Sequence, residues 1–236
     1  TWWFAILVFL VLATLVFVVV KRNKKNAEEK ALIKQRIAET KLEALKSQMN
    51  PHFTFNAMNT IQDFIISNDI DNSLNFVSEL AKLMRLTLDN STKKTISLQE
   101  EIAFLKNYIY IENTRFGNKI NVNLSIDSEI NTQEIEVPTM LLQPFVENVF
   151  VHAFNAEHPN PKLDILFQLK EANVLECRIQ DNGKGKASFK KVKIHESKAL
   201  QLATERLQLI QPQILNPITT NFTESEGTFV VILLQV

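Results

Sequence analysis

The stretch VPTMLLQPFVENVFVHAF, residues 137–154, indicates the fold class of this 236-residue chain. Its apolar residues recur three and four positions apart, so we expect a helix over about residues 139–154. A second helix is expected over residues 197–210. Apolar and polar residues alternate, as in half-buried strands, in residues 120–126, 163–169 and 174–179, and the chain ends on the apolar run 229–236. The second half is therefore predicted to be α+β, a two-layer sandwich of an antiparallel-rich sheet covered by helices.

Two polar residues interrupt the apolar 139–154 helix. Asn148 and His152 lie four residues apart, so in a regular α-helix they share one face. An asparagine amide oxygen is a hard ligand, suited to a Mg²⁺ ion that also holds phosphates. Glu147 is adjacent but lies on a different part of the helix surface. A structural explanation stays open, in which these polar groups only satisfy one another at the edge of the core.

The sequence DNGKG, residues 181–185, directly follows the 174–179 strand. Because Asp, Asn and Gly favour tight backbone geometry, a simple turn explains it without any function. As a site, Asp181 supplies a carboxylate at a strand end that can accept a hydrogen bond from an exocyclic amine such as adenine N6. Gly183 and Gly185 have no side chain, so a ligand can approach their backbone closely.

A helical region is expected before the sandwich. Residues 51–90 carry apolar residues at helical spacing and are interrupted by the turn-like NDIDN at 68–72, which predicts two helices in hairpin order. Ser97 and Glu100 have the spacing of a capping box, so a further helix is expected from there to about Phe116.

His52 follows a proline in QMNPHFTFN, residues 48–56. A proline within a helical stretch removes a backbone hydrogen bond and kinks the helix, which can leave the next side chain exposed. A neutral imidazole, with an unperturbed pKa of ~6.5, is a competent nucleophile at neutral pH. The alternative is a structural histidine beside a kink.

Residues 1–20 contain no charged side chain. As a helix, residues 2–20 span ~28 Å, close to the ~30 Å of a bilayer core. Trp2 and Trp3 stand at one end and four basic residues within 21–25 at the other, which places residue 21 onward in the cytoplasm. We expect a helix that crosses the cytoplasmic (inner) membrane once. A buried core helix is the alternative, whereas a signal peptide carries its positive charges before the apolar run.

The first residue is Thr rather than Met, so a further segment is expected on the outer side of the membrane. Residues 27–50 are rich in charge and free of Gly and Pro, and their apolar residues show a weak heptad-like spacing. They are expected to form a short parallel coiled coil, or else a solvated single helix.

Composition excludes several classes of protein. The chain has 26 Lys and Arg against 26 Asp and Glu, which argues against a broadly electrostatic nucleic-acid binder. Its single cysteine, Cys177, forms no internal disulfide, and no residues have the spacing of a metal-ligand cluster.

Four sequence blocks, in this order, resemble the autolysin-sensor (LytS-like) family of sensor histidine kinases. The blocks are LKSQMNPHFTFNAMNTI (45–61), SLQEEIAFLKNYIYIENTRFG (97–117), VPTMLLQPFVENVFVHAF (137–154) and DNGKG (181–185). The resemblance runs from about residue 41 to residue 236. It implies a helical dimerisation and phosphoacceptor region (51–117) and a GHKL-type (Bergerat) ATP-binding catalytic domain (118–236). These follow the transmembrane helix (1–20) and the juxtamembrane helix or coiled coil (21–50) that the residue patterns predict.

The resemblance also implies a role for each residue that matches a family motif. His52 matches the phosphoacceptor histidine and Asn56 the asparagine that follows it. Asn148 matches the asparagine that coordinates the Mg²⁺ of Mg-ATP, with two further ATP-site residues in the same block, Glu147 and His152. Asp181 matches the aspartate that recognises adenine, with the loop glycines Gly183 and Gly185.

A family member of this kind is a membrane-bound sensor protein-histidine kinase, an ATP-dependent phosphotransferase of two-component signalling. It is expected to act as a homodimer, to autophosphorylate His52 from Mg-ATP and to pass the phosphoryl group to an aspartate of a response regulator. In this family the regulator typically carries a LytTR DNA-binding domain, so this chain itself is not expected to bind nucleic acid.

One stretch departs from the family pattern. Many members carry GxGLxNxxxRL where this chain has SKALQLATERL, residues 197–207, so Ser197 and Ala199 replace both glycines. Ser197 can still cap the following helix and present a hydroxyl group to phosphate. Two alternatives follow: a catalytically weak pseudokinase scaffold of the same fold, and a GHKL-type ATPase, which has no use for the His52 motif.

Overall fold

The computed structural model describes Trp2 and residues 21–22, 51–154, 158–170, 173–183, 198–214, 216–223 and 227–235. The chain divides into two compact units, Thr1–Thr54 and Phe55–Val236. Most of the expected transmembrane helix, and nearly all of the expected juxtamembrane helix, lie outside the described residues. Among the residues that are described, no helix combines the length and apolar character needed to cross a bilayer.

The predicted helical hairpin is confirmed. Helix α2 spans Pro51–Ile66 and α3 spans Ile70–Ser91. Between them Asn68 adopts a positive φ of 57°, and the Asp69 carboxylate accepts the Asn72 N–H at 3.3 Å to cap α3. The polar residues of the turn therefore end one helix and begin the next.

Helix α4, Leu98–Arg115, also begins as predicted. Ser97 Oγ accepts the Glu100 N–H at 3.2 Å, and Glu100 Oε2 accepts the Ser97 N–H at 3.0 Å, which completes the capping box. Helix α4 packs beside α3, where the Asn107 amide donates to the Glu79 carboxylate and the Asn75 amide donates to the Tyr110 hydroxyl group at 2.8 Å.

A five-stranded mixed sheet forms the second layer. Its strands are β2 (Asn121–Ile126), β4 (Lys162–Lys170), β5 (Val174–Asp181), β6 (Ile218–Thr223) and β7 (Gly227–Gln235), in the spatial order β2-β4-β5-β7-β6. Strands β2 and β4 are parallel, and the other neighbouring pairs are antiparallel, with Ile165 opposite Ile179 and Cys177 opposite Ile232. The expected α+β class and antiparallel-rich sheet are therefore confirmed.

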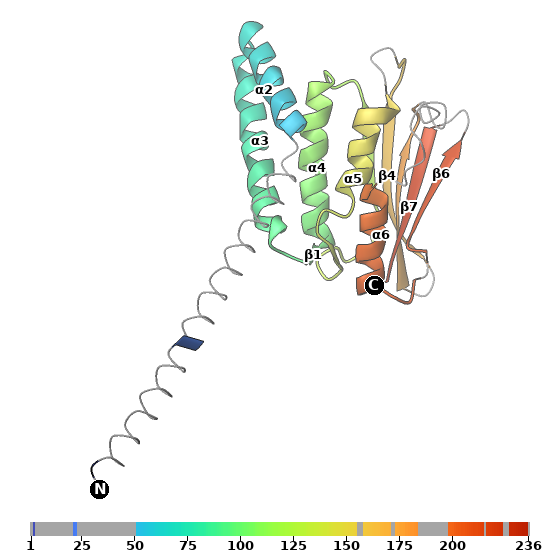
Figure 1. Ribbon diagram of the computed structural model, residues 1–236. Helices are drawn as coiled ribbons and strands as arrows, with labels where there is room; N and C mark the ends of the chain where they lie inside the picture. The colour runs from blue at the N-terminus through green and yellow to red at the C-terminus, as the bar shows by residue number, and fades with distance from the viewer. Residues whose placement is uncertain are drawn as a thin grey trace. The chain divides into compact units, whose positions relative to one another are not determined.

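One face of this sheet is the core. Buried side chains alternate along the three central strands: Leu163, Ile165, Phe167, Leu175, Cys177, Ile179, Val230, Ile232 and Leu234. Figure 1 shows α4, α5 (Gln143–Asn148) and α6 (Lys198–Ile210) on one side of the sheet. The opposite face carries ion pairs such as Lys162–Asp164 and Arg178–Glu176. This alternation is the two-layer arrangement that the sequence predicts.

The helix predicted over residues 139–154 requires a correction. Only Gln143–Asn148 form the α-helix α5, and Val149–Ala153 continue as one turn of π-helix, η1. The start is delayed because Met140 adopts a positive φ of 56°. Two further features were missed: strand β6, and a separate two-stranded sheet of β1 (Thr95–Ser97) with β3 (Glu136–Pro138).

Candidate functional site

The candidate site includes the carboxyl end of β5, where Asp181 is buried with 4% of its surface exposed. Its Oδ1 atom accepts a hydrogen bond from the Gly183 N–H at 2.8 Å and another from the Thr228 N–H at 3.4 Å. Burial raises the pKa of this carboxyl group, whereas the two backbone hydrogen bonds and the nearby His158 lower it. The carboxyl group is thus held in one orientation between the loop after β5 and the start of β7.

Two glycines allow the backbone to pack closely around Asp181. A Cβ atom on Gly183 would lie 2.3 Å from the carbonyl oxygen of Ala153, the last residue of η1. A Cβ atom on Gly227, which has a positive φ of 92°, would lie 2.0 Å from the carbonyl oxygen of Asp181. No side chain fits at either position without a shift of backbone. The loop after Asp181 therefore lies directly against the end of the helical segment that carries Asn148.

Asn182, the residue between Asp181 and Gly183, has a structural role. Asn182 Oδ1 accepts the Lys162 N–H at 2.7 Å, and Asn182 Nδ2 donates to the Asn160 carbonyl oxygen at 2.8 Å. His158 Nε2 lies 3.0 Å from the Asn182 carbonyl oxygen, so Nε2 is the protonated nitrogen in this contact. These bonds fasten the loop to the beginning of β4.

Asn148 is the last residue of α5 and is half-buried, as is Glu147, whereas His152 is exposed in η1. The expectation that Asn148 and His152 share one face assumed a regular α-helix. Because a π-helical turn begins at Val149, the spacing of four residues no longer implies a shared face. π-helical turns of this kind often occur at functional sites.

A half-buried amide oxygen at Asn148 fits a Mg²⁺ ion for which phosphates and water supply most ligands. The missing side chain at Gly183 lets the loop after Asp181 pack directly on the Ala153 backbone, which brings the Asp181 end of the site next to the helical segment that carries Asn148. Within the described part of the chain, no group of three or more His, Cys, Asp or Glu side chains is arranged to hold a metal ion.

The 197–207 stretch keeps two residues of the family pattern, and the structure shows what they contact. Arg206 Nη1 donates to the Thr139 carbonyl oxygen at 3.2 Å, and Leu207 is fully buried. Arg206 therefore anchors α6 to the segment that leads into α5. Ala203 is buried on the same helix, whereas Leu202 is 57% exposed.

One residue that holds this region was not predicted. Glu101, on α4, is fully buried and accepts hydrogen bonds from the Met140 and Leu142 N–H groups at 3.0 and 2.9 Å. Its position among the acidic residues of a helix first turn suggests only a favourable contact with the helix dipole. The only signal for it in the sequence was a pair of adjacent glutamates at 100–101. Glu100 completes the capping box, whereas Glu101 is directed inward.

Three predicted site residues are not fully described. The backbone of His52 lies in α2, but its side chain is outside the described part of the structure, and Gly185 and Ser197 are outside it altogether. Asn56 is half-buried in α2, and its carbonyl oxygen accepts the Thr60 hydroxyl group at 3.1 Å.

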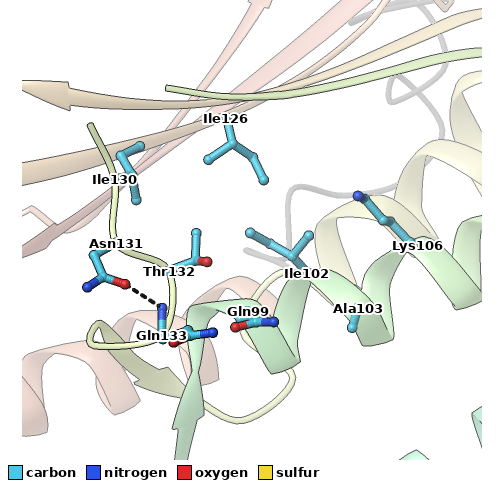
Figure 2. A pocket seen from close by; sticks show the side chains of 9 residues that line it. All are labelled: Gln99, Ile102, Ala103, Lys106, Ile126, Ile130, Asn131, Thr132 and Gln133. Atoms are coloured by element: carbon cyan, nitrogen blue, oxygen red, sulfur yellow. Dashed lines mark hydrogen bonds between the residues drawn. The ribbon is translucent and has the colours of Figure 1, made fainter. Parts of the chain in front are cut away.

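A separate pocket of about 490 Å³ lies between α4 and the segment after β2. Figure 2 shows its lining: Gln99, Ile102, Ala103, Lys106, Ile126, Ile130, Asn131, Thr132 and Gln133. The Gln99 N–H donates to the Thr132 carbonyl oxygen at 2.9 Å and ties the two sides together. None of the predicted site residues lines this pocket.

The fold and this site together define a class: an α+β domain with a mixed sheet, in which a carboxylate loop packs on an asparagine-bearing helix. Residues 40–120 match the family model described as histidine kinase. Sensor protein LytS of Staphylococcus epidermidis is 31% identical over 151 residues, which cover 64% of this chain and 25% of that protein. LytS of Bacillus subtilis is 32% identical over 149 residues, which cover 63% and 24%.

These findings confirm the resemblance predicted from the sequence blocks: the chain is similar to the LytS-type sensor histidine kinases. A Staphylococcus aureus relative, named sensor histidine kinase/phosphatase LytS, is 28% identical over 149 residues. The matched region corresponds to about 25% of the length of these relatives.

Solved histidine kinase structures are also similar to this chain. The histidine kinase domain of the Erythrobacter litoralis EL346 blue-light activated kinase has a TM-score of 0.45 and 16% identity, covering 78% of this chain and 94% of that one. Acinetobacter baumannii histidine kinase AdeS has a TM-score of 0.43 and 11% identity, covering 84% and 96%.

Proposed function

We propose that this chain is part of a membrane-bound sensor protein-histidine kinase that autophosphorylates His52 from Mg-ATP. The phosphoryl group then passes to an aspartate of a response regulator, with a LytTR-type regulator as the expected partner. The observation that carries the proposal is the packing of the Asp181 loop on the Asn148 helix, with the Gly183 backbone against Ala153. This juxtaposition is what a GHKL-type nucleotide site requires.

Each site residue has a separate task in this proposal. Asp181, already oriented by the Gly183 and Thr228 N–H groups, accepts a hydrogen bond from the adenine amine. Asn148 supplies an amide oxygen to Mg²⁺, while Glu147 and His152 lie near the phosphates. Bound Mg²⁺ neutralises negative charge on the phosphates. Gly183 lets the Asp181 loop pack on Ala153 beside the nucleotide. Gly185 permits close approach of the nucleotide, and Ser197 contacts phosphate.

The phosphoryl transfer itself needs mainly positioning. A ring nitrogen of His52 forms a bond to the γ-phosphorus of ATP as the bond from that phosphorus to the bridging oxygen breaks, and ADP leaves. Asn56 lies one helical turn after His52 and orients this region of α2. In the second transfer, the phosphorus–nitrogen bond breaks and the regulator's carboxylate takes the phosphoryl group.

Exposed apolar side chains on α2 and α3 support a homodimer. On α3, Leu74, Val77 and Leu88 lie on one helical face and are 66%, 44% and 49% exposed. On α2, Phe55, Met58, Ile65 and Ile66 are 55% exposed or more. An apolar surface of this kind is typical of an interface with another protein surface. We propose that it packs against the same surface of a second copy.

The uncharged residues 1–20 and the basic residues that follow support the membrane part of the proposal. We propose that the kinase region lies on the cytoplasmic side of the cytoplasmic membrane, with a single crossing in this chain.

The altered 197–207 stretch favours a second candidate function, a pseudokinase scaffold. Ser197 and Ala199 replace glycines, and the exposed Leu202 replaces an asparagine. The Arg206 contact to Thr139 is nevertheless kept, so α6 is still anchored beside the site.

Measuring ADP formation and γ-label incorporation together, for wild type and His52→Ala, distinguishes these functions. A kinase incorporates acid-labile, alkali-stable label that His52→Ala abolishes. Continued ADP formation in His52→Ala without label indicates an ATPase and contradicts the proposal. A folded wild type that forms neither product indicates the scaffold.

A further inference from the structure

Helix α5 begins in an unusual way. The segment 139–142 is not helical, and Met140 has a positive φ of 56°, which is unfavourable for a residue with a long side chain. Leu142, the N-cap residue, makes no capping hydrogen bond with its side chain. The first N–H groups of a helix need acceptors from elsewhere. Something outside α5 must therefore hold this segment in place.

Glu101 supplies acceptors for the N–H groups of this non-helical segment. Its Oε2 accepts the Met140 N–H at 3.0 Å and its Oε1 accepts the Leu142 N–H at 2.9 Å, so both carboxyl oxygens are used on one short segment. The side chain is fully buried, and a buried carboxyl group is costly unless its hydrogen bonds are made. The buried Glu101 carboxyl group, which is costly to bury, thus holds the strained backbone of residues 140–142.

Neighbouring contacts hold the same segment from the loop after α3 and from α6. The Thr139 hydroxyl group donates to the Lys93 carbonyl oxygen at 3.0 Å, and Arg206 of α6 donates to the Thr139 carbonyl oxygen at 3.2 Å. Met140 and Leu142, nearer to α5, are the residues whose N–H groups Glu101 binds. Among these contacts, only those of Glu101 act directly on the backbone at the start of α5.

The start of α5 determines where Asn148 lies. Asn148 lies six positions after Leu142, about 9 Å along the helix, so a shift at the start moves Asn148 with it. At the other end, the Phe116 ring packs against Phe150 with 5.9 Å between ring centres. Both contacts come from α4 or the residue that ends it.

We propose that Glu101 is a positioning residue for the nucleotide site: it fixes the backbone at the start of α5 and thereby places the Asn148 amide where Mg²⁺ binds. This inference rests on the proposed function for the role of Asn148. Glu101 itself does not touch the nucleotide.

The structural half of this proposal is tested without any ligand. Amide hydrogen exchange is measured on the complete chain in detergent, for wild type and for Glu101→Gln, which keeps the shape but replaces one acceptor by a donor. We expect faster exchange in residues 140–148 and unchanged exchange in β4 and β5. Exchange that is unchanged in residues 140–148 would overturn the proposal whether or not the chain binds ATP.

The functional half is tested by the affinity for ATP with and without Mg²⁺. Because Glu101 acts through Asn148, Glu101→Gln should weaken Mg-ATP binding by about tenfold to a hundredfold and leave metal-free ATP binding unchanged. Asn148→Ala should show the same pattern. Equal losses with and without Mg²⁺ would indicate a purely structural role and overturn the proposal.

Two variants control for general effects. Ile165→Val removes a buried methyl group from β4, so it destabilises the same domain away from α5, and its Mg-ATP affinity should stay at the wild-type value. Glu134→Gln makes the same chemical change at an exposed position and should match wild type in both experiments. A wild type that binds no ATP in either condition contradicts the proposed function, and this inference with it, even where hydrogen exchange responds as expected.

Discussion

Asp181 illustrates how one side chain connects fold and site at the scale of single residues. It ends β5, it is buried, and one of its carboxyl oxygens is committed to the backbone of Gly183 and Thr228. The fold therefore sets the orientation of this group before any ligand arrives, and preorganisation of this kind lowers the entropic cost of binding.

Replacing Asp181 by Asn tests its proposed role. The fold should be retained, because Asn keeps an oxygen for the two N–H groups. The adenine amine, however, would then face a donor where it needs an acceptor. We expect ATP affinity to fall by about tenfold to a hundredfold, since a hydrogen bond to a charged group is lost. Calorimetric titration measures the affinity and circular dichroism the fold. Asp164→Asn, on the outer face of the sheet, should bind like wild type, and equal affinities for both variants would contradict the role of Asp181.

Glu101 predicts a pH dependence of stability. Burial raises the pKa of its carboxyl group from 4.5 to about 7, against the opposing effects of backbone hydrogen bonds and of Arg206. Between these values the folded chain holds a proton that the unfolded chain has lost. The stabilising contribution of the protonated Glu101 carboxyl group to the free energy of unfolding is therefore fully present below pH 4.5 and is lost as the pH rises to about 7.

Urea unfolding of wild type and Glu101→Gln at pH 5 and pH 8 measures this effect. The wild type should lose roughly 1–3 kcal/mol more than the variant over this interval. The difference between the two proteins isolates Glu101 from Asp181, whose raised pKa acts in the same direction. An identical pH dependence in both proteins would show that Glu101 does not titrate as described.

Asp181 can be predicted from the sequence, whereas Glu101 cannot. Asp181 was identified because it stands in a short glycine-containing loop after a clear strand. Glu101 was not, because its carboxyl group meets residues 140 and 142 only after the chain has folded. A contact between residues about 40 positions apart leaves no local pattern.

Among the contacts between elements, the one between the loop after β5 and η1 leaves no space for a side chain at Gly183. Gly183→Ala would push a Cβ atom into the Ala153 carbonyl group, so backbone must move on one side. We expect a loss of stability of about 1–3 kcal/mol together with a clear loss of ATP affinity. Thermal unfolding and calorimetric titration measure the two effects.

Gly117→Ala provides the matched control. Its Cβ atom meets only the end of the Lys119 side chain at 3.9 Å, but the positive φ of 69° makes alanine unfavourable there. This variant should lose about 1 kcal/mol of stability and keep its ATP affinity. Loss of affinity in both variants would mean that instability, and not the loop contact, explains the effect of Gly183→Ala.

Most elements were predictable because local sequence signals are clear. Examples are the capping box of α4 and the strict alternation of apolar and polar residues in β4. The helix over residues 139–154 was not, because its apolar spacing carries no sign of the positive φ at Met140 or of the π-helical turn. Both depend on partners from α4, α6 and the loop after β5. Tertiary contacts overrode local preference here.

At the scale of the whole molecule, the exposed apolar face of α3 predicts self-association. Leu74→Glu places a charge on this face, which is 66% exposed at that position, and should shift the chain from dimer to monomer. Analytical ultracentrifugation of the detergent-solubilised chain measures the change. Leu209→Glu, at an 84% exposed position on α6, should leave the dimer intact. A dimer that survives Leu74→Glu would place the interface elsewhere.

The membrane helix and the His52 motif were predicted from sequence alone, and the side chains that would test them lie outside the described residues. The order of regions along the chain therefore stays a prediction. The site within Phe55–Val236 rests on described contacts, whereas the transfer from it to His52 stays a proposal.

The central claim is that a nucleotide held by Asp181 and Asn148 phosphorylates His52. The most direct measurement is incubation of the chain with γ-labelled Mg-ATP, beside His52→Ala and Asn148→Ala. Acid-labile, alkali-stable label is expected on wild type and on neither variant. Label that persists in His52→Ala, or a folded, dimeric wild type that acquires no label, would contradict it.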